Sequence, residues 1–518
     1  MKTHTIALAF AVMGLLAGCE DAQKPGPAEL QALTEADDLI GLLPTSTLAA
    51  VELLDLEARW DELRAIRPMA NLQDHMLDAL DLNADDVPAI AGDRMVVALV
   101  AGDNWRGLVP VAVLDPPSTD EARRRLADSD EVFAVEARGA LWVGPATQAR
   151  WVERLAAGDG TSLHQVVDRG ALAERLPPGG LVRVVLNSRA LGQWLRGWAE
   201  YQSNLPARAL ARLIAADLLA IEAAGLRRDI VDGRLVTDLW VGIDDEVVPD
   251  AIVQALAADR GPAVLPPELP ANWVVAKSFR TEPEAGLAWL RALAARDPDG
   301  PLRQLDFWID EFESRTGHDV ESDIIASLGA RGLALVLEGG DGGVELVAVI
   351  EARDPDRLEA ALVELRDWLG EQIRGRTLGL ARWQMRDGDG ARGTAHALDV
   401  RSPFGRFSGP VFQVVNDHLV LATDQRSLSF GLELAGSAAS WVTPVWAAAG
   451  GAPDEIAVIR MNALAGILAE APLVSAGQSD RLEILNEFLA GVSEGRLRVD
   501  YEPDGFRMTG WLELAPSE

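Results

Sequence analysis

Residues 85–100 read DDVPAIAGDRMVVALV, and residues 321–337 read ESDIIASLGARGLALVL. In both stretches an acidic start leads through glycine and arginine into an uninterrupted apolar run. The apolar runs, 95–100 and 333–337, have the length and composition of β-strands. One pattern is therefore written twice, more than 200 residues apart, and a period of that length predicts a duplicated domain rather than a solenoid.

Further blocks repeat in the same order in both halves. They comprise an apolar strand after a Leu-Pro turn, a hairpin strand, a helix, a helix after a second hairpin, a strand that runs into asparagine and a helix, and a closing Gly-Arg-Leu. The paired members are 48–54 and 273–279, 108–114 and 344–350, 119–127 and 355–369, 147–157 and 425–434, 181–186 and 456–459, and 233–235 and 495–497.

Short turns join most of the expected strands, and such turns can connect only antiparallel neighbours. One expected strand carries Val344, Leu346, Val347 and Val349, and apolar residues at both odd and even positions predict cover on both faces. The sequence therefore predicts an α+β fold made of two tandem homologous domains, each a largely antiparallel sheet covered by helices. The first repeat is expected over 39–246 and the second over 271–515, with a Pro-rich linker at 247–270 and an insertion at 373–409.

Cys19 is the only cysteine of the 518 residues. It follows a short positive start and an apolar run that ends in Leu16-Ala17-Gly18. This segment is similar to the lipobox of bacterial lipoproteins. The resemblance implies removal of the signal peptide 1–18 between Gly18 and Cys19, and acylation of the Cys19 thiol and its new amine. The alternative is an ordinary secretory signal with a chance cysteine.

The segment 19–38 is polar and contains two prolines, so we expect a flexible tether between lipid and first domain. Glu20 directly follows Cys19. In Gram-negative lipoproteins an aspartate at that position usually retains the protein in the inner membrane. By that resemblance the expected location is the cell envelope, at the outer membrane facing the periplasm rather than at the inner membrane. No second cysteine is present for a disulfide, and a chain of this length can form a core without one.

The formal net charge is −33, from 80 acidic and 47 basic residues. So acidic a chain disfavours nucleic acid and electrostatic docking on anionic lipid headgroups. A cationic partner attracted by this field is one interpretation. The favoured one is a solvated surface typical of a salt-tolerant or GC-rich organism.

Leu43-Pro44-Thr45-Ser46-Thr47 runs into the first expected strand. This opening resembles a family of domains of unknown function in bacterial envelope proteins, in which a Leu-Pro-x-x-Thr turn precedes the first strand. The resemblance covers about the first 60 residues of one half, and it implies no activity.

Signatures of known chemistry are missing from the sequence. It contains no G-x-S-x-G elbow, phosphate-binding loop or dinucleotide fingerprint. Its six histidines form no closely spaced ligand pair, and Asp387-Gly388-Asp389-Gly390 lacks the later ligands of a calcium loop. The sequence therefore predicts no catalytic, cofactor-binding or metal-binding residues.

Two features leave a binding role open. Trp194 and Trp198 lie one turn apart on an expected helix, where they would line a ligand cleft or simply fill a core. A second expected helix, 207–224, carries an apolar stripe that suits a lipid-carrying groove or an ordinary core. Its members are Leu210, Leu213, Ile214, Leu218 and Ile221.

The sequence favours a non-enzymatic envelope protein, anchored to the membrane by lipid, that binds an envelope protein or an apolar ligand. The alternative is an envelope hydrolase with an unrecognised carboxylate or Ser/His site. A structural spacer without a ligand is the third hypothesis.

Overall fold

The computed structural model of the chain describes residues between 39 and 514. The expected signal peptide, Cys19 and the expected tether lie outside the described residues, as do Gly388, Asp389 and Gly390 and the histidines at 75 and 164. Within the range, the residues not described are 66–86, 103–107, 117, 127–131, 159–161, 164–171, 173, 177–179, 202–204, 232–233, 245, 258–261, 281, 298–301, 340–343, 377–380, 388–393, 403–404, 449–452, 471–491 and 503.

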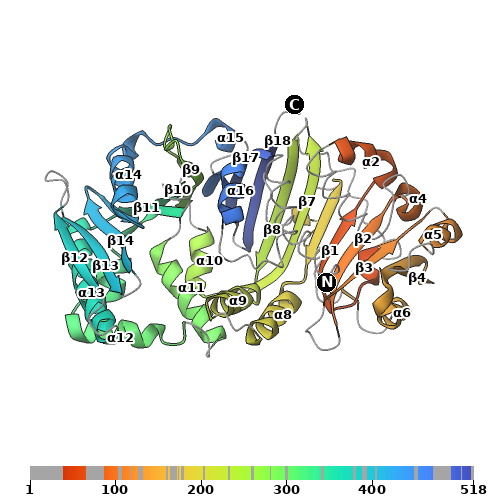
Figure 1. Cartoon of the computed structure of the whole chain (residues 1–518), viewed down its shortest axis with the longest axis horizontal. Coiled ribbons are helices and arrows are strands. Elements are labelled where there is room, and N and C mark those ends of the chain that lie inside the picture. The colour runs from red at the N-terminus through yellow and green to blue at the C-terminus, as the bar shows by residue number, and fades with distance from the viewer. Residues whose placement is uncertain are drawn as a thin grey trace. The chain divides into compact units, whose positions relative to one another are not determined.

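The chain divides into two compact units (Figure 1). The first unit comprises Met1–Val247, Ala471–Leu497 and Asp504–Glu518, and the second comprises Val248–Glu470 and Arg498–Pro503. The α+β class and the largely antiparallel sheet are confirmed. The division differs from the expected repeats at both boundaries. Residues 248–270 of the expected linker belong to the second unit, and Ala471–Leu497 and Asp504–Glu518 belong to the first.

The first unit is built on an eight-stranded sheet with the order β4-β5-β3-β2-β1-β6-β7-β8. All of its neighbouring strands are antiparallel. A further strand, β18, lies beside β8, where the Ile243 amide donates to the Asp504 carbonyl at 3.0 Å. The strands are β1 Thr47–Leu53, β2 Met95–Ala101, β3 Leu108–Leu114, β4 Val132–Ala137, β5 Ala140–Pro145, β6 Val182–Leu186, β7 Ile221–Val231, β8 Arg234–Ile243 and β18 Gly505–Leu514.

One face of this sheet carries the core of the first unit. In β2 and β3 every second residue is buried, because successive side chains of a strand point to opposite faces. These residues pack with Trp142 of β5 and with Val152 of α6. The helices are α2 Leu56–Ala65, α4 Val87–Ala91, α5 Thr119–Leu126, α6 Ala149–Ala157, α8 Ser188–Glu200 and α9 Leu205–Leu218, with 3₁₀ turns at Leu39–Leu42 and Ala146–Gln148.

The second unit has the strand order β12-β13-β14-β15-β11-β10-β9-β16, followed by β17, which the unit boundary divides at Leu497 and Arg498. All neighbouring strands from β12 to β16 in this order pair antiparallel. The strands are β9 Trp273–Arg280, β10 Leu328–Glu338, β11 Val344–Ala352, β12 Ala381–Asp387, β13 Thr394–Ser402, β14 Gly405–Val415, β15 His418–Ala422, β16 Glu455–Arg460 and β17 Val492–Glu502.

Helix α14 covers one face of this second sheet, against β11, β14 and β15. Helix α13 and a π-helical turn pack on the other face, where Leu358 is buried with Val414 and Leu419. The helices are α10 Asp250–Ala257, α11 Pro283–Arg296, α12 Leu305–Thr316, the π-helix Val320–Ile325, α13 Pro355–Arg376, α14 Gln425–Gly436, a 3₁₀ turn Ala438–Ser440, α15 Val445–Ala448 and α16 Met461–Glu470.

The expectation of cover on both sheet faces is wrong for part of β11. Val347 and Val349 are buried, whereas Val344 and Leu346 on the same strand are 44% and 50% exposed. Apolar residues at both odd and even positions of a strand do not distinguish the face that is covered from the face that meets solvent.

The segment 247–270 is more than a linker. It contains α10, and Ala263 and Leu265 are buried in the core of the second unit. The Ala263 amide donates to the Pro453 carbonyl at 2.8 Å. The prolines mark turns in this segment, but the apolar residues between them anchor it to the sheet.

Candidate functional site

Helix α8 starts at a side-chain cap that also holds the first strand. The Asn187 side chain accepts a hydrogen bond from the Ala190 amide at 3.1 Å, as an N-cap residue does. Its Nδ2 donates to the Thr45 carbonyl at 2.9 Å, and its backbone amide donates to the Leu48 carbonyl at 2.9 Å. The first turn of α8 is therefore fixed to the start of β1.

Both tryptophans singled out in the sequence lie on α8 and stack on each other. The ring centroids of Trp194 and Trp198 are 6.4 Å apart, with 24° between the ring planes. Trp194 packs against the small apolar cluster of Leu48, Ala101 and Ala190, whereas Trp198 is 38% exposed. The pair is thus half core and half surface.

Tyr201 extends this pair beyond the end of α8. It lies three residues after Trp198 and is 61% exposed, and its amide donates to the Trp198 carbonyl at 3.1 Å. Residues at i, i+4 and i+7 share one helix face, so we call Trp194, Trp198 and Tyr201 the aromatic face of α8. Sequence reasoning missed Tyr201, although its helical spacing to the tryptophans was the signal for it.

The expected helix 207–224 is wrong at its end and in its buried face. Helix α9 stops at Leu218, and β7 starts at Ile221. Ala211, Ala215 and Ala216 are buried, whereas Ile214 of the expected apolar stripe is 45% exposed.

The physical reason is the close approach of α8 and α9. The Ala215 carbonyl lies 3.0 Å from where a Cβ on Gly192 would stand. Small residues permit that approach, and they are buried in place of the larger side chains of the expected apolar stripe. Figure 1 draws the two helices side by side.

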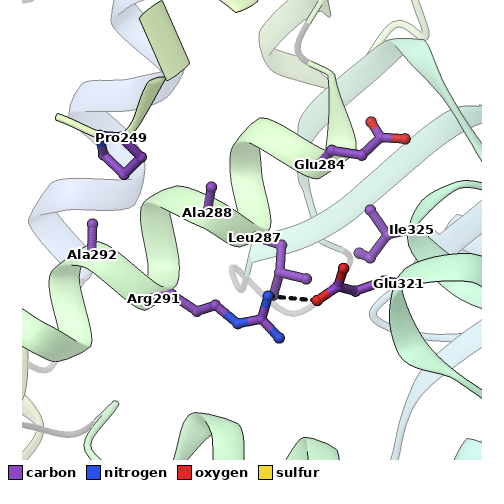
Figure 2. A pocket seen from close by; sticks show the side chains of 8 residues that line it. All are labelled: Pro249, Glu284, Leu287, Ala288, Arg291, Ala292, Glu321 and Ile325. Carbon is purple, nitrogen blue, oxygen red and sulfur yellow. Dashed lines mark hydrogen bonds and ion pairs between the residues drawn. The ribbon is translucent and has the colours of Figure 1, made fainter. Parts of the chain in front are cut away.

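The second unit contains a pocket of about 390 Å³ beside α11 (Figure 2). Arg291 crosses it and donates to Asp306 at 2.9 Å and to Glu321 at 2.6 Å. These hydrogen bonds, that to Glu321 foremost, raise the pKa of Arg291. The cation is therefore already neutralised by two carboxylates. The lining residues are Pro249, Glu284, Leu287, Ala288, Arg291, Ala292, Glu321 and Ile325.

A polar cluster surrounds the π-helix that supplies Glu321. Asp323 accepts from the Asp319 amide at 3.0 Å, from Arg357 Nε at 2.7 Å and from His318 Nδ1 at 3.0 Å. The backbone hydrogen bond from Asp319 is the largest cause that lowers the pKa of Asp323 to about 2. A carboxylate that orients an imidazole is one part of a general-base pair. The Ser322 hydroxyl, however, donates to Asp323 and accepts a hydrogen bond from Arg357, so its proton is directed at Asp323 and not at His318.

A second histidine of the second unit is buried. His396 Nδ1 lies 2.8 Å from Arg366 Nη1, and both side chains are buried. Burial, and then the charge of Arg366, lower the pKa of His396. The imidazole is therefore neutral, and its Nδ1 accepts from the guanidinium instead of facing a metal. No group of three His, Cys, Asp or Glu side chains suited to a metal ion occurs in the part of the chain that the structure describes.

Within the described residues, no helix is both long enough and apolar enough to cross a bilayer.

Comparisons with known proteins leave the family open. No family model matches the chain, and no curated protein matches it. A solved structure, crystal form I of TP0453, aligns with 40% of this chain and 78% of its own, at 7% sequence identity and a TM-score of 0.22. So low a TM-score does not establish a shared fold.

Proposed function

We propose that this protein is a lipid-anchored member of the bacterial cell envelope that serves as a non-enzymatic binding or scaffold module for a protein or an apolar ligand. The observation that carries the anchor is the single cysteine in Leu16-Ala17-Gly18-Cys19. Cleavage before Cys19 and its acylation would hold the chain at a membrane without a spanning helix. The proposed location is the periplasmic face of the outer membrane.

The proposal includes a duplicated architecture, which strand order supports. One sheet runs β4-β5-β3-β2-β1-β6-β7-β8, and the other contains the run β14-β15-β11-β10-β9-β16-β17-β18. Element by element, the two runs have the same order along the chain and across the sheet. The β12–β13 hairpin is the only addition between described strands, at the edge next to β14, and it falls in the expected insertion 373–409.

The aromatic face of α8 supports a binding role over a purely structural one. Trp198 and Tyr201 leave large apolar ring surfaces in contact with water. Aromatic residues of this kind are enriched where one surface binds another. The pocket beside α11 contributes less, because its cation is paired with two carboxylates.

Mass spectrometry of the mature protein from a bacterial envelope tests the anchor. We expect loss of residues 1–18 and the added mass of acyl chains on Cys19. The matched variant Cys19→Ser should keep its fold and leave the membrane fraction. An intact Met1, or a free thiol at Cys19 in membrane-bound protein, would contradict the proposal.

Photo-cross-linking in intact cells tests the binding role. A cross-linker placed at Tyr201 should trap a defined envelope component, whereas one at Phe307, which is 58% exposed in the second unit, should not. Identical products from both positions would exclude a specific role for the aromatic face.

The alternative is an envelope hydrolase, and the His318–Asp323 pair is the observation that favours it. Such an enzyme would show turnover that His318→Gln abolishes and Ser314→Ala leaves unchanged. A broad hydrolase screen without turnover would exclude it.

A further inference from the structure

We propose that the aromatic face of α8 docks into the headgroup–acyl boundary of the membrane that holds the lipid at Cys19. This inference rests on the proposed anchor and adds a second contact between protein and bilayer. The acyl chains at Cys19 would hold the protein at the membrane, and a second contact of different chemistry would fix its orientation there.

The chemistry of this face suits the bilayer interface. Trp198 and Tyr201 are exposed, and each combines an apolar ring with a polar N–H or O–H group. Tryptophan and tyrosine concentrate at membrane–water interfaces, because the apolar ring is removed from water there while the polar N–H or O–H group stays hydrated. Trp194 stacks on Trp198 and links that ring to the buried cluster of Leu48, Ala101 and Ala190.

The chain enters the fold beside α8. Leu39 and Ile40, at the start of the described chain, are buried in the first unit's core. A few residues later, the carbonyls of Thr45 and Leu48 accept hydrogen bonds from Asn187, which caps α8. Leu48 also packs in the cluster that holds Trp194. The chain after Cys19 therefore enters the fold beside the N-terminal end of α8, and Tyr201 lies about 20 Å further along that helix.

The length of chain before that point keeps the two contacts close. Cys19 and Leu39 are 20 positions apart, so the segment between them spans at most about 70 Å when fully extended. As a random coil it would span roughly 25 Å on average. A segment of this length would allow α8 to contact the membrane that holds Cys19.

Charge sets the hairpin of α8 and α9 apart from the rest of the chain. Residues 188–218 contain four arginines against two acidic residues, a local net charge of +2 in a chain of −33. Electrostatic interactions at physiological ionic strength extend over roughly 8 Å, so a surface that approaches this hairpin meets mainly the local charge. Arg189 is already paired with Asp244 at 3.1 Å. Because this segment lacks the acidic excess of the chain as a whole, the occupant that fits its exposed aromatic residues is a bilayer.

The fold itself does not require aromatic residues here. Helix α16 follows β16 and packs on β9, as α8 follows β6 and packs on β1. Its sequence, MNALAGILAE, contains no aromatic residue. The rings of α8 are therefore an addition to a helix that the architecture accommodates without them.

A single-cysteine label tests the docking apart from the anchor. The full chain with Cys19→Ser has no other thiol, so Tyr201→Cys in that background accepts one environment-sensitive nitrobenzoxadiazole dye. Vesicles of phosphatidylethanolamine and phosphatidylglycerol should blue-shift its emission and raise it at least about twofold, as entry into the interface does. Phe307→Cys in the same background is the matched control, since Phe307 is 58% and Tyr201 61% exposed.

A response at Tyr201→Cys that Trp198→Ala weakens, with none at Phe307→Cys, supports the proposal. No response at Tyr201→Cys, or equal responses at both positions, overturns it, and a protein partner for this face would give the former result. Because the labelled chain carries no lipid, a silent label leaves the anchor untouched. Interfacial docking without lipid is weak and needs an excess of vesicles, so Cys19→Ser should still be washed from cell membranes, and that release tests the anchor separately.

Discussion

In the proposed duplication, helices α8 and α16 are counterparts, but they present different surfaces. Each follows a strand that is third from one edge of its sheet, and each has an asparagine in its first turn or just before it. Helix α8 carries Trp194 and Trp198 and packs on α9 through Gly192, whereas a Cβ on Gly466 of α16 would meet open space. The difference shows which features belong to the fold and which to one half alone. The shared features position the helix, and the aromatic face is a feature of the first unit.

The central strands of the two sheets give the comparison with the largest expected effect. Glu52 of β1 is fully buried and accepts from Arg94 at 2.8 Å, whereas Lys277 of β9 is 45% exposed beside Glu455. Glu52→Gln should lower the free energy of unfolding by about 3 kcal/mol, because it leaves a partly buried guanidinium without its counter-charge. Lys277→Met should cost less, about 1–2 kcal/mol, because the ammonium it removes is half exposed, although the buried Glu455 carboxylate loses its partner. Urea denaturation followed by circular dichroism measures both, and equal losses would remove this contrast between the sheets.

The contact between α8 and α9 should give the next largest effect. A side chain at Gly192 would collide with the Ala215 backbone and with Leu219. Gly192→Val should therefore cost about 1–3 kcal/mol of stability. Gly466→Ala in α16 is the control, and it should stabilise by roughly 0.5–1 kcal/mol because open space surrounds that site. A tolerated Gly192→Val would mean that the helices can separate without cost.

The polar cluster around the π-helix of the second unit gives a smaller effect on stability, and this effect depends on pH. The pKa of Asp323 falls from 3.8 to about 2 through its hydrogen bonds to Asp319, Arg357 and His318. A carboxyl with a depressed pKa in the folded state stabilises above its unfolded value, and this contribution disappears as pH falls from about 4 to about 2. Asp323→Asn should therefore cost about 1 kcal/mol at neutral pH. Thermal unfolding measured across pH checks this, because the stabilities of the wild-type chain and of Asp323→Asn should converge near pH 2. A stability difference that stays constant with pH would assign the loss to packing.

Trp198 should give the smallest effect on folding. Because its ring is 38% exposed, Trp198→Ala should change stability by no more than about 0.5–1 kcal/mol. The control is Trp142→Ala, which removes a fully buried ring from the first core and should cost about 3–5 kcal/mol. A large loss in Trp198→Ala would make the aromatic face part of the core and weaken its proposed role at a membrane.

Several predictions of strands and turns are confirmed because they depend on the local sequence. Apolar runs, glycine turns and the ordered blocks located β2, β3, β10 and β11 close to where they lie. The alternating segments of the insertion became β12 and β13. The predictions that are wrong concern burial, which depends on the segment packed against an element. They are the buried face of α9 and the solvent-facing end of β11. Of the candidate site, the sequence supplied Trp194 and Trp198 but neither their stacking nor Tyr201.

The sequence by itself determined the signal-like start with its single cysteine, the α+β class and the repeated order of elements, because each is written in residue type and short-range spacing. Only the tertiary structure decided that β18 lies beside β8, that alanines rather than leucines are buried on α9, and that Trp198 and Tyr201 face water. The physical reason is that periodicity defines the faces of an element, whereas burial depends on which distant segment packs against each face.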